Sequence, residues 1–273
     1  MKALKVRCFG DTLVKLSLLI ANDDGISTGL RALANAAAER GHDVFIATTS
    51  NHSSGASKSI SFKARYRLTR LFDKYDALVA DSTPATAVGI ALDSLGRKFN
   101  FVISGVNSGP NIGLWDVLSS GTVGAVLEGV TRGYKGIAVS LVARDWSEYQ
   151  SLGYEAYYTA ARLAINLLEL LADEPWEAPL LNLNVPTWTL RGVQVATLET
   201  ASQFEVYKCR EGLCDMSRWT LESAYRCATP NSDVCLIKQG FATLTPLTFA
   251  VTGPMDWLVK KLGKREATFS WIT

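Results

Sequence analysis

The chain of 273 residues is long for one domain of roughly 150 residues and short for two, so we expect one large domain with an appendage. Hydrophobic residues make up 48% of it, charged residues 20% and aromatic residues 10%, a globular composition that excludes intrinsic disorder and fibrous repeats. The 28 basic and 26 acidic residues leave a net charge of +2 without any Lys/Arg run, so no nucleic-acid polymer and no anionic membrane is expected as a partner.

The start of the chain predicts a cytoplasmic protein. Residues 1–19 carry charges scattered among apolar positions, so the uninterrupted apolar region of a secretory signal is missing. No stretch approaches the roughly 18 apolar residues that a membrane-spanning helix needs. The five cysteines are an odd number in a chain too long to depend on a disulfide framework, which favours a reducing compartment.

In chain order, apolar segments predict strands at 16–21, 43–48, 77–80, 101–104, 137–142 and 181–185. Helical spacing of apolar residues predicts helices at 30–40, 86–95 and 123–132, and one long helix over 148–171 that ends before Pro175 and Pro179. Nearly all-apolar strands separated by helices predict an α/β fold, a Rossmann-like and mostly parallel sheet with helices on both faces. Ligands of such sheets bind at the carboxyl ends of the strands.

The strand and helix rhythm stops after Pro186. Short β-like pieces at 192–198, 204–208 and 234–237 alternate there with polar loops that carry cysteines. We therefore expect a catalytic core over 16–186 and a β-rich C-terminal arm and tail over 187–273, part of which returns to the core. A hairpin for oligomerisation and a lid over the site both fit this pattern.

The loop after the first strand holds two adjacent acids, Asp23 and Asp24, followed by Gly25. Adjacent side chains on a strand point to opposite faces, so both acids can converge only where the chain has left strand geometry. Two hard oxygen ligands without a nearby cysteine or histidine select Mg²⁺, Mn²⁺ or Ca²⁺ over zinc. A solvated turn is the alternative, because Asx-turns and helix caps favour the same residues.

The same loop contains the pattern Gly-x-Ser-x-Gly around Ser27, between a strand and a helix as in the nucleophile elbow of serine hydrolases. A triad then needs an acid and a later histidine. The two histidines, His42 and His52, lie early and close to this serine, an order that does not suit the fold. A serine esterase that uses Ser27 is kept as an alternative.

Three further loops carry small polar residues. The loop over 53–57 suits either phosphate cradling or an ordinary polar turn. A long Gly- and Asn-rich connection over 104–113 offers Asn107 and Asn111 as oxygen ligands or amide donors. The residues 119–122 open a helix, where free N–H groups and the helix dipole attract an anion, with plain N-capping as the alternative. For 82–84 we favour capping, with Pro84 in the first turn.

No Gly-x-Gly-x-x-Gly follows a predicted strand and no Walker A sequence is present. Taken together, however, the loops resemble the survival protein SurE family of divalent-metal-dependent nucleotidases and phosphatases. The matching segments are LLIANDDGI (18–26), SGAS (54–57), VISGVNSGPN (102–111), SSGTVG (119–124) with LEG (127–129), LNVP (183–186) and GFATLTPL (240–247). They occur in family order and span about 16–247.

The resemblance implies hydrolysis of phosphate monoesters, chiefly nucleoside 5′- or 3′-monophosphates. It implies one Mg²⁺ or Mn²⁺ ion per subunit, held by Asp23, Asp24, Ser54 and Asn107, and a homodimer or homotetramer in which the C-terminal hairpin reaches a neighbour. Asp23, Asp24 and Asn107 are the expected catalytic residues. The expected phosphate and substrate contacts are Asn22, Ser54, Asn111, Ser120, Gly121 and Thr122.

The chain departs from the family pattern in three places. Residues 82–86 read Ser-Thr-Pro-Ala-Thr where the family usually has Gly-Thr-Pro-x-Asp, so substrate preference is open and a nucleotide-binding protein without turnover is a second alternative. The segment before Leu16 is longer than the family's usual start and fits an added strand or a tail. Residues 255–273 have no clear counterpart.

Four cysteines, Cys209, Cys214, Cys227 and Cys235, fall in the expected arm. Buried free thiols are the first expectation. A zinc site lacks the usual Cys-x-x-Cys spacing, and disulfides would suit an intracellular protein of a hyperthermophile.

Overall fold

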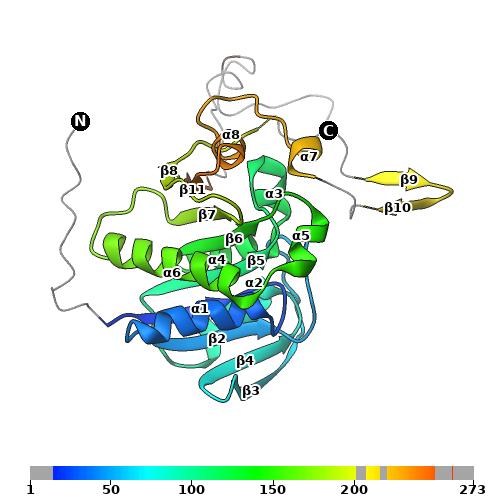
Figure 1. The fold of residues 1–273 in the computed structure, drawn as a ribbon. Coiled ribbons are helices and arrows are strands. Elements are labelled where there is room, and N and C mark those ends of the chain that lie inside the picture. Colours follow the sequence, from blue (N-terminus) through cyan, green and yellow to red (C-terminus); the bar gives the residue numbers. More distant parts are fainter. Residues whose placement is uncertain (1–14, 201–206, 216–219, 250–259, 261–273) are drawn as a thin grey trace.

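The computed structural model describes residues 15–200, 207–215, 220–249 and 260 (Figure 1). A nine-stranded sheet with the order β3-β4-β2-β1-β5-β6-β7-β11-β8 forms the centre of the molecule. Its strands are β1 (Ser17–Ala21), β2 (Asp43–Thr49), β3 (Arg65–Leu71), β4 (Tyr75–Asp81), β5 (Phe101–Ser108), β6 (Lys135–Val142), β7 (Leu180–Pro186), β8 (Val193–Val195) and β11 (Ala242–Leu247).

The central strands β4, β2, β1, β5, β6 and β7 pair in parallel. β3 pairs antiparallel with β4 at one edge, and β11 pairs antiparallel with β7 near the other. The predicted α/β, mostly parallel sheet is therefore confirmed. β8 and β11 come from the C-terminal region, which thus adds two strands to the same sheet.

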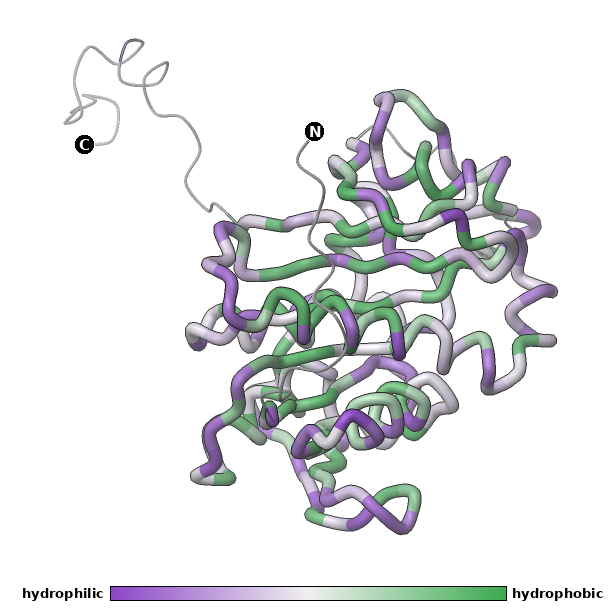
Figure 2. The backbone as a smooth tube through the Cα atoms, turned by 60° about the vertical axis from the view of Figure 1, so that its left-hand side comes forward, coloured by the Kyte–Doolittle hydropathy of each residue, from purple (hydrophilic) through white to green (hydrophobic). Residues whose placement is uncertain are grey.

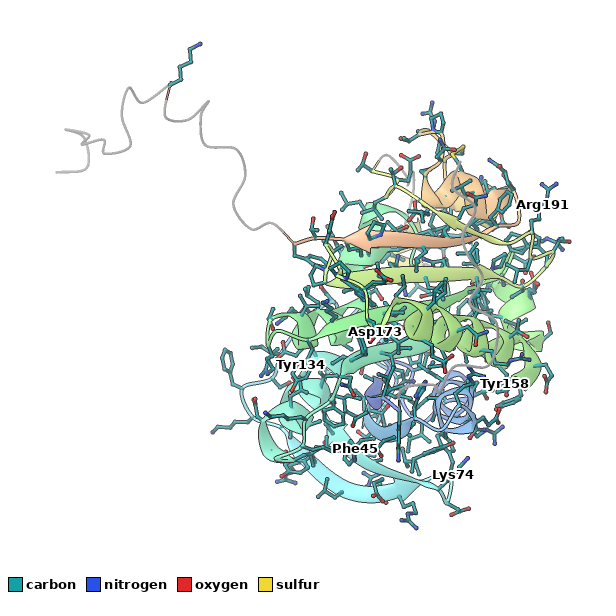
Figure 3. The ribbon with its side chains drawn as sticks, turned by 90° about the vertical axis from the view of Figure 1, so that its left-hand side faces the viewer. Phe45, Lys74, Tyr134, Tyr158, Asp173 and Arg191 are labelled. Carbon is teal, nitrogen blue, oxygen red and sulfur yellow. A yellow bond between two sulfur atoms is a disulfide. The ribbon has the colours of Figure 1, made fainter. Side chains whose placement is uncertain are left out.

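The principal helices are α1 (Thr28–Glu39), α2 (Pro84–Ser94), α3 (Gly113–Ser119), α4 (Gly121–Val130), α5 (Trp146–Ser151) and α6 (Tyr154–Leu171). α1 and α6 cover one face of the sheet, and α2 and α4 cover the other. Figure 2 shows hydrophobic colour along the central strands, which are buried between these helix layers. In Figure 3, Tyr158 lies on the α6 side of the sheet and Tyr134 on the opposite side.

The close approach of α1 to β5 depends on Gly29. A Cβ atom added there would lie 2.0 Å from the carbonyl oxygen of Val106, a distance that no side chain can occupy. The first turn of α1 therefore sits directly against β5, the strand that carries Asn107.

Several boundaries differ from the sequence expectation. The predicted helix over 148–171 is two helices, because the chain turns at Leu152 and Gly153, where Leu152 has left the helical region with φ −68° and ψ 122°. The short strand predicted at 234–237 is wrong: this segment is the helix α8 (Asp233–Lys238). Ser232 caps α8 by accepting a hydrogen bond from the Cys235 N–H, a local signal that outweighs four apolar residues in a row.

The C-terminal region also contains α7 (Leu221–Ala224) and a small antiparallel hairpin of β9 (Lys208–Arg210) and β10 (Leu213–Asp215). Figure 1 shows this hairpin extending away from the main sheet beyond α7. Most of the strand predicted at 204–208 lies outside the described residues, as do the segments 1–14 and 255–259 and 261–273.

The four cysteines of this region form two disulfides, Cys209–Cys214 in the hairpin and Cys227–Cys235 beside α8. The expectation of buried free thiols is therefore wrong. The pairs were missed because spacing alone does not define which cysteines meet.

None of the helices in the described part of the chain has the length and hydropathy of a membrane-spanning segment.

Candidate active site

The predicted site loops meet at the carboxyl ends of the central strands. β1 lies between β2 and β5, and all three strands run in parallel. The chain passes from β1 to β2 on one side, whereas β5 comes later and lies on the other side of β1. The strand order therefore reverses next to β1, which is the position where α/β sheets bind ligands.

Backbone hydrogen bonds tie these loops together. The N–H of Ser53 donates to the carbonyl of Asp23 at 2.7 Å, and the N–H of Ser57 donates to the carbonyl of Ser119 at 2.9 Å. The hydroxyl of Ser57 also donates to the carbonyl of Leu118 at 2.6 Å. The loop after β2 thus holds both the loop after β1 and the residues that lead into α4.

Asp23 is buried against the first turn of α4. Its side chain accepts a 2.5 Å hydrogen bond at Oδ1 from the hydroxyl of Thr122. A Cβ atom added at Gly121 would lie 2.8 Å from Oδ2 of Asp23, so glycine makes room for the carboxylate. Burial, and after it the charge of Asp24, raise the pKa of Asp23 to about 7. Ionising this carboxylate is therefore costly unless a positive charge lies nearby.

Asp24 connects the loop after β1 with β5 and with the loop after β2. Its Oδ2 accepts a hydrogen bond from the N–H of Ser108 at 3.1 Å. Its Oδ1 lies 3.0 Å from Nε2 of His52, yet this oxygen is buried and has no partner in hydrogen-bond geometry. The contact with the Asp24 carboxylate raises the pKa of His52. A buried carboxylate oxygen without a hydrogen bond is an atom that a bound cation would satisfy.

Ser54 and Asp24 contact the same ring nitrogen of His52. The Oγ of Ser54 is 3.2 Å from this Nε2. Asn107 is buried at the end of β5, and its Nδ2 donates a 2.9 Å hydrogen bond to the carbonyl of Gly109. With Nδ2 used in this way, Oδ1 is the atom that Asn107 offers to a cation.

The expectation of a loop over the whole of 104–113 is wrong in its first half. β5 continues through Ser108, with a bulge between Ser104 and Asn107. Polar residues in a fully buried strand hid this continuation from the sequence pattern. Bulges beside active sites re-aim side chains, and this bulge directly precedes Asn107.

Asn22 and Asn111, expected as substrate contacts, are bonded within the protein. Asn22 is buried; its Nδ2 donates to the carbonyl of Gly25 and to Ser27 Oγ, and its Oδ1 accepts from the hydroxyl of Thr48. These bonds shape the turn that presents the two acids. The Asn22 side chain therefore has a role in the turn, and its expected contact with the substrate stays a prediction.

Asn111 is held by β6 and β7. Its N–H donates to Asn184 Oδ1 at 2.9 Å and its Nδ2 donates to Ser140 Oγ at 2.7 Å. Its carbonyl accepts from Nδ2 of Asn182 at 2.8 Å and of Asn184 at 3.1 Å. Both donors that Asn111 was expected to offer to phosphate are engaged, so this residue anchors the turn between β5 and α3.

The first turn of α4 supplies the remaining expected groups. Ser120 caps the helix, because its hydroxyl accepts a hydrogen bond from the Val123 N–H at 3.1 Å. Gly121 and Thr122 are the first helical residues, and the N–H groups at the start of a helix have no partner within it. Together with the helix dipole, these N–H groups favour an anion near Asp23.

The family model for the survival protein SurE matches residues 18–205, which include both acids, Ser54, Asn107 and the start of α4. The chain belongs to the SurE family.

SurE proteins from other organisms resemble it over most of its length. It is 32% identical over 245 residues to the "5'/3'-nucleotidase SurE" of Yersinia pseudotuberculosis, covering 87% of this chain and 91% of that protein. It is 36% identical over 178 residues to the "5'-nucleotidase SurE" of Prochlorococcus marinus, covering 63% of this chain and 64% of that relative. The crystal structure of the SurE protein from Aquifex aeolicus has the same fold, with a TM-score of 0.69 at 24% identity, covering 90% of this chain and 97% of that chain.

Ser27 has a structural role in this SurE-family chain. Its hydroxyl accepts hydrogen bonds from the Leu30 N–H at 3.2 Å and from Asn22 Nδ2 at 3.0 Å, which makes it the N-cap of α1. Ser27 stands between a strand and a helix, as in a nucleophile elbow, but here its hydroxyl caps the helix.

His52 lies at the site but was not among the expected site residues, since the sequence pattern suggested it only as part of a serine triad. Its place two residues before Ser54 was the available signal. The described residues contain no cluster of three or more His, Cys, Asp or Glu side chains suited to a metal ion. The ligand set implied by the family resemblance has two carboxylates, one hydroxyl and one amide.

Proposed function

We propose that this protein hydrolyses phosphate monoesters, chiefly nucleoside 5′- or 3′-monophosphates, with the help of one Mg²⁺ or Mn²⁺ ion per subunit. The observation that carries the proposal is the pair of acids at the switch point of the sheet. Asp23 is buried against the first turn of α4, and the buried side chain of Asp24 lies between Ser108 and His52. The names of the relatives, 5′-nucleotidase and 5′/3′-nucleotidase, support the same reaction.

Asp23, Asp24, Ser54 and Asn107 are the residues that would hold the ion. The donor set fits, because hard oxygen ligands suit Mg²⁺ and Mn²⁺, and Oδ1 of Asp24 is buried without a hydrogen bond. Asp23 fits as well, since its pKa of about 7 reflects burial beside a second acid. When bound, the ion would supply Lewis-acid stabilisation of phosphoryl charge and a nucleophile at neutral pH.

The first turn of α4 would bind the phosphate. The N–H groups of Gly121 and Thr122 begin this helix, and their position next to Asp23 supports an anion site beside the proposed cation site. Fixed donors of this kind stabilise charge on phosphoryl oxygens without reorganising during the reaction. The hydroxyl of Thr122 orients Asp23 at the same time.

A phosphate-release assay tests the proposal. Nucleoside monophosphates are incubated with the protein in Mg²⁺, in Mn²⁺ and with chelator. We expect release with a divalent ion and loss of release in chelator. Binding of a nucleoside monophosphate by calorimetry without phosphate release in either ion would instead identify a binding protein without turnover, and unaltered release in chelator would contradict the metal requirement.

We infer a homodimer or homotetramer in which the β9–β10 hairpin reaches a neighbouring subunit. The hairpin extends away from the main sheet (Figure 1), and Tyr207 and Leu213 beside and within it are 59% and 74% exposed. Exposed large apolar side chains on a projecting hairpin favour a protein contact. Light scattering on the intact chain and on a Leu213→Asp variant tests this, and a monomer for the intact chain contradicts it.

The cytoplasmic location stays a prediction. Two disulfides are unusual in a reducing compartment, except in intracellular proteins of hyperthermophiles. Thiol titration of protein taken directly from its source cells, with alkylation at lysis, tests whether both bridges exist there.

A further inference from the structure

In the part of the chain that the structure describes, His52 is the imidazole that lies next to the expected ion ligands, and the ligand set implied by the family does not include it. Its Nε2 lies 3.0 Å from Oδ1 of Asp24 and 3.2 Å from Oγ of Ser54. Both of these oxygens belong to residues that we propose as ligands. The ring therefore reaches into the expected coordination shell from the loop after β2.

The contact with Asp24 joins the ring nitrogen to a carboxylate oxygen as an ion pair at 3.0 Å. The same nitrogen lies 3.2 Å from the hydroxyl oxygen of Ser54. Without its proton, Nε2 is an electron-pair donor like these two oxygens, so a cation could take the place of the proton in this contact.

The distances agree with such sharing. Adjacent ligands of an octahedral ion at about 2.1 Å lie roughly 3.0 Å apart, and the Nε2 distances to Asp24 and Ser54 are 3.0 Å and 3.2 Å. Asp23, Asp24 and His52 do not form a metal-suited cluster by themselves in the structure, so ligation by His52 would need the oxygens of Ser54 and Asn107 in the same shell. The side chain of His52 is 64% exposed, so this ring lies at the open side of the site.

We propose that Nε2 of His52 is a further ligand of the divalent ion, and that it makes the site prefer a first-row transition-metal ion over Mg²⁺. Imidazole nitrogen is a good ligand for transition metals and a poor one for Mg²⁺, which takes oxygen ligands. The inference rests on the proposed function, since it concerns the same ion. It concerns the identity of the metal, which the carboxylates alone leave open.

The chain offers a clean spectroscopic test because it has only two histidines. His42 is buried next to Asp43, at the start of β2, and its Nε2 lies 3.1 Å from Glu169. His42 therefore lies at the amino end of β2, whereas the site lies at the carboxyl ends of the strands. A nitrogen signal from a labelled histidine at the bound ion would therefore come from His52.

The experiment uses Mn²⁺ as the probe with the full chain labelled with ¹⁵N at histidine alone. Pulsed electron paramagnetic resonance of the bound Mn²⁺ is expected to show ¹⁵N coupling, which His52→Gln removes. Outer-shell partners alone change metal affinity roughly 10- to 100-fold, so we expect His52→Gln to weaken Mn²⁺ binding at least about tenfold and Mg²⁺ binding much less. Asn51→Ala, a change at the neighbouring exposed residue, is the control and should keep both the coupling and the affinity.

Mn²⁺ that binds without ¹⁵N coupling, and with equal affinity in His52→Gln, would overturn this inference and leave the proposed function intact. A protein that binds no Mn²⁺ and releases no phosphate with any ion would overturn the proposed function itself. Circular dichroism and the melting temperature of His52→Gln show that the variant is folded.

Discussion

The hydroxyl of Thr122, the second residue of α4, donates a 2.5 Å hydrogen bond to Oδ1 of Asp23 in the loop after β1. The two residues are 99 positions apart in sequence. This bond joins the proposed phosphate-binding turn to the proposed ion ligand, so the two halves of the site form one unit. The hydrogen bond lowers the pKa of Asp23, but burial and the charge of Asp24 outweigh it, so the pKa is about 7.

Asp23→Asn should stabilise the metal-free protein at neutral pH while it weakens binding of the ion. Asp23 has a folded-state pKa of about 7 against an ordinary value of 3.8. Between these values the folded chain keeps a proton that the unfolded chain has released, so the parent's free energy of unfolding falls as pH rises. The variant has no such proton, and its amide oxygen can still accept from Thr122.

Urea unfolding in chelator measures this difference. We expect the variant and parent to match near pH 4 and to diverge up to about pH 7, with the gain limited to about 4 kcal/mol. Titration with Mn²⁺ should show much weaker binding and no turnover for the variant. A variant that is less stable than the metal-free parent at pH 8 would contradict the raised pKa of Asp23.

Asn184→Asp should impair turnover through Asn111. Asn184 accepts from the Asn111 N–H and donates to its carbonyl. An aspartate keeps the acceptor and replaces the donor by an oxygen that repels the carbonyl. Because small displacements of positioning residues cost up to about 100-fold, we expect kcat/KM to fall about tenfold to 100-fold.

The control is Thr243→Val, in the β11 residue that pairs with Asn184 in the sheet register. The Thr243 hydroxyl is buried without a hydrogen bond, so an apolar side chain of equal shape should be neutral or stabilising. Equal losses of kcat/KM in both variants would show that general packing, not the hold on Asn111, explains the effect.

The sequence predicted the sheet and the loop position of Asp23 and Asp24, because the local pattern of apolar residues agrees there with burial in the fold. The apolar strands are buried on both faces, and the loop with Asp23 and Asp24 follows one of them directly. The strand predicted at 234–237 was wrong because four apolar residues fit a strand or a helix equally well. The N-cap Ser232 favours the helix. The hold of Asn184 on Asn111 was not predictable, since it joins residues 73 positions apart.

His52 illustrates the same limit within the site. The motif pointed to Ser54, but only the fold brings the imidazole within 3.0 Å of Asp24. Asn22 shows the reverse case, in which a residue inside a matching motif uses its side chain to build the turn. A motif therefore marks a stretch of the chain, and the structure is needed to separate the proposed ligands from the residues that build the turn.

Ser27→Ala should lower stability and still allow phosphate release, because Asn22 keeps its bonds to Gly25 and Thr48. Loss of an N-cap costs about 1 kcal/mol, and Ser27 caps α1. Thr83→Ala is the matched variant, because Thr83 caps α2 through the Thr86 N–H in the same way. Both should melt at lower temperature and still turn over substrate. Hydrolysis of p-nitrophenyl acetate that disappears in Ser27→Ala alone would favour the serine esterase.

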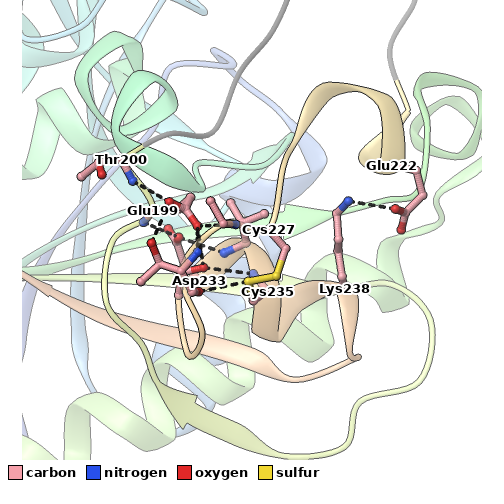
Figure 4. The surroundings of a disulfide bond; sticks show 11 residues. Glu199, Thr200, Glu222, Cys227, Asp233, Cys235 and Lys238 are labelled. Carbon is pink, nitrogen blue, oxygen red and sulfur yellow. Dashed lines mark hydrogen bonds and ion pairs between the residues drawn. A yellow bond between two sulfur atoms is a disulfide. The ribbon is translucent and has the colours of Figure 1, made fainter.

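Loss of the Cys227–Cys235 disulfide should reach the site through Glu199 and Asp233. Figure 4 shows the bridge beside these two buried acids. Glu199 Oε2 accepts from the N–H groups of Ala228 and Thr229, which lie in the loop that the bridge closes. Asp233 accepts from the N–H of Gly113 at 2.8 Å, the first residue of α3.

The double variant Cys227→Ser with Cys235→Ser should therefore have a free energy of unfolding lower by about 2–3 kcal/mol, from the loop entropy of a short bridge. It should also bind substrate more weakly, because α3 leads into the proposed phosphate-binding turn. The matched control is Cys209→Ser with Cys214→Ser, which opens the bridge in the β9–β10 hairpin. Melting curves and KM for a nucleoside monophosphate are measured for both. A raised KM in the first variant only is expected, since the 227–235 loop supports the first residue of α3 through Asp233. An unchanged KM with lowered stability would restrict this bridge to a purely stabilising role.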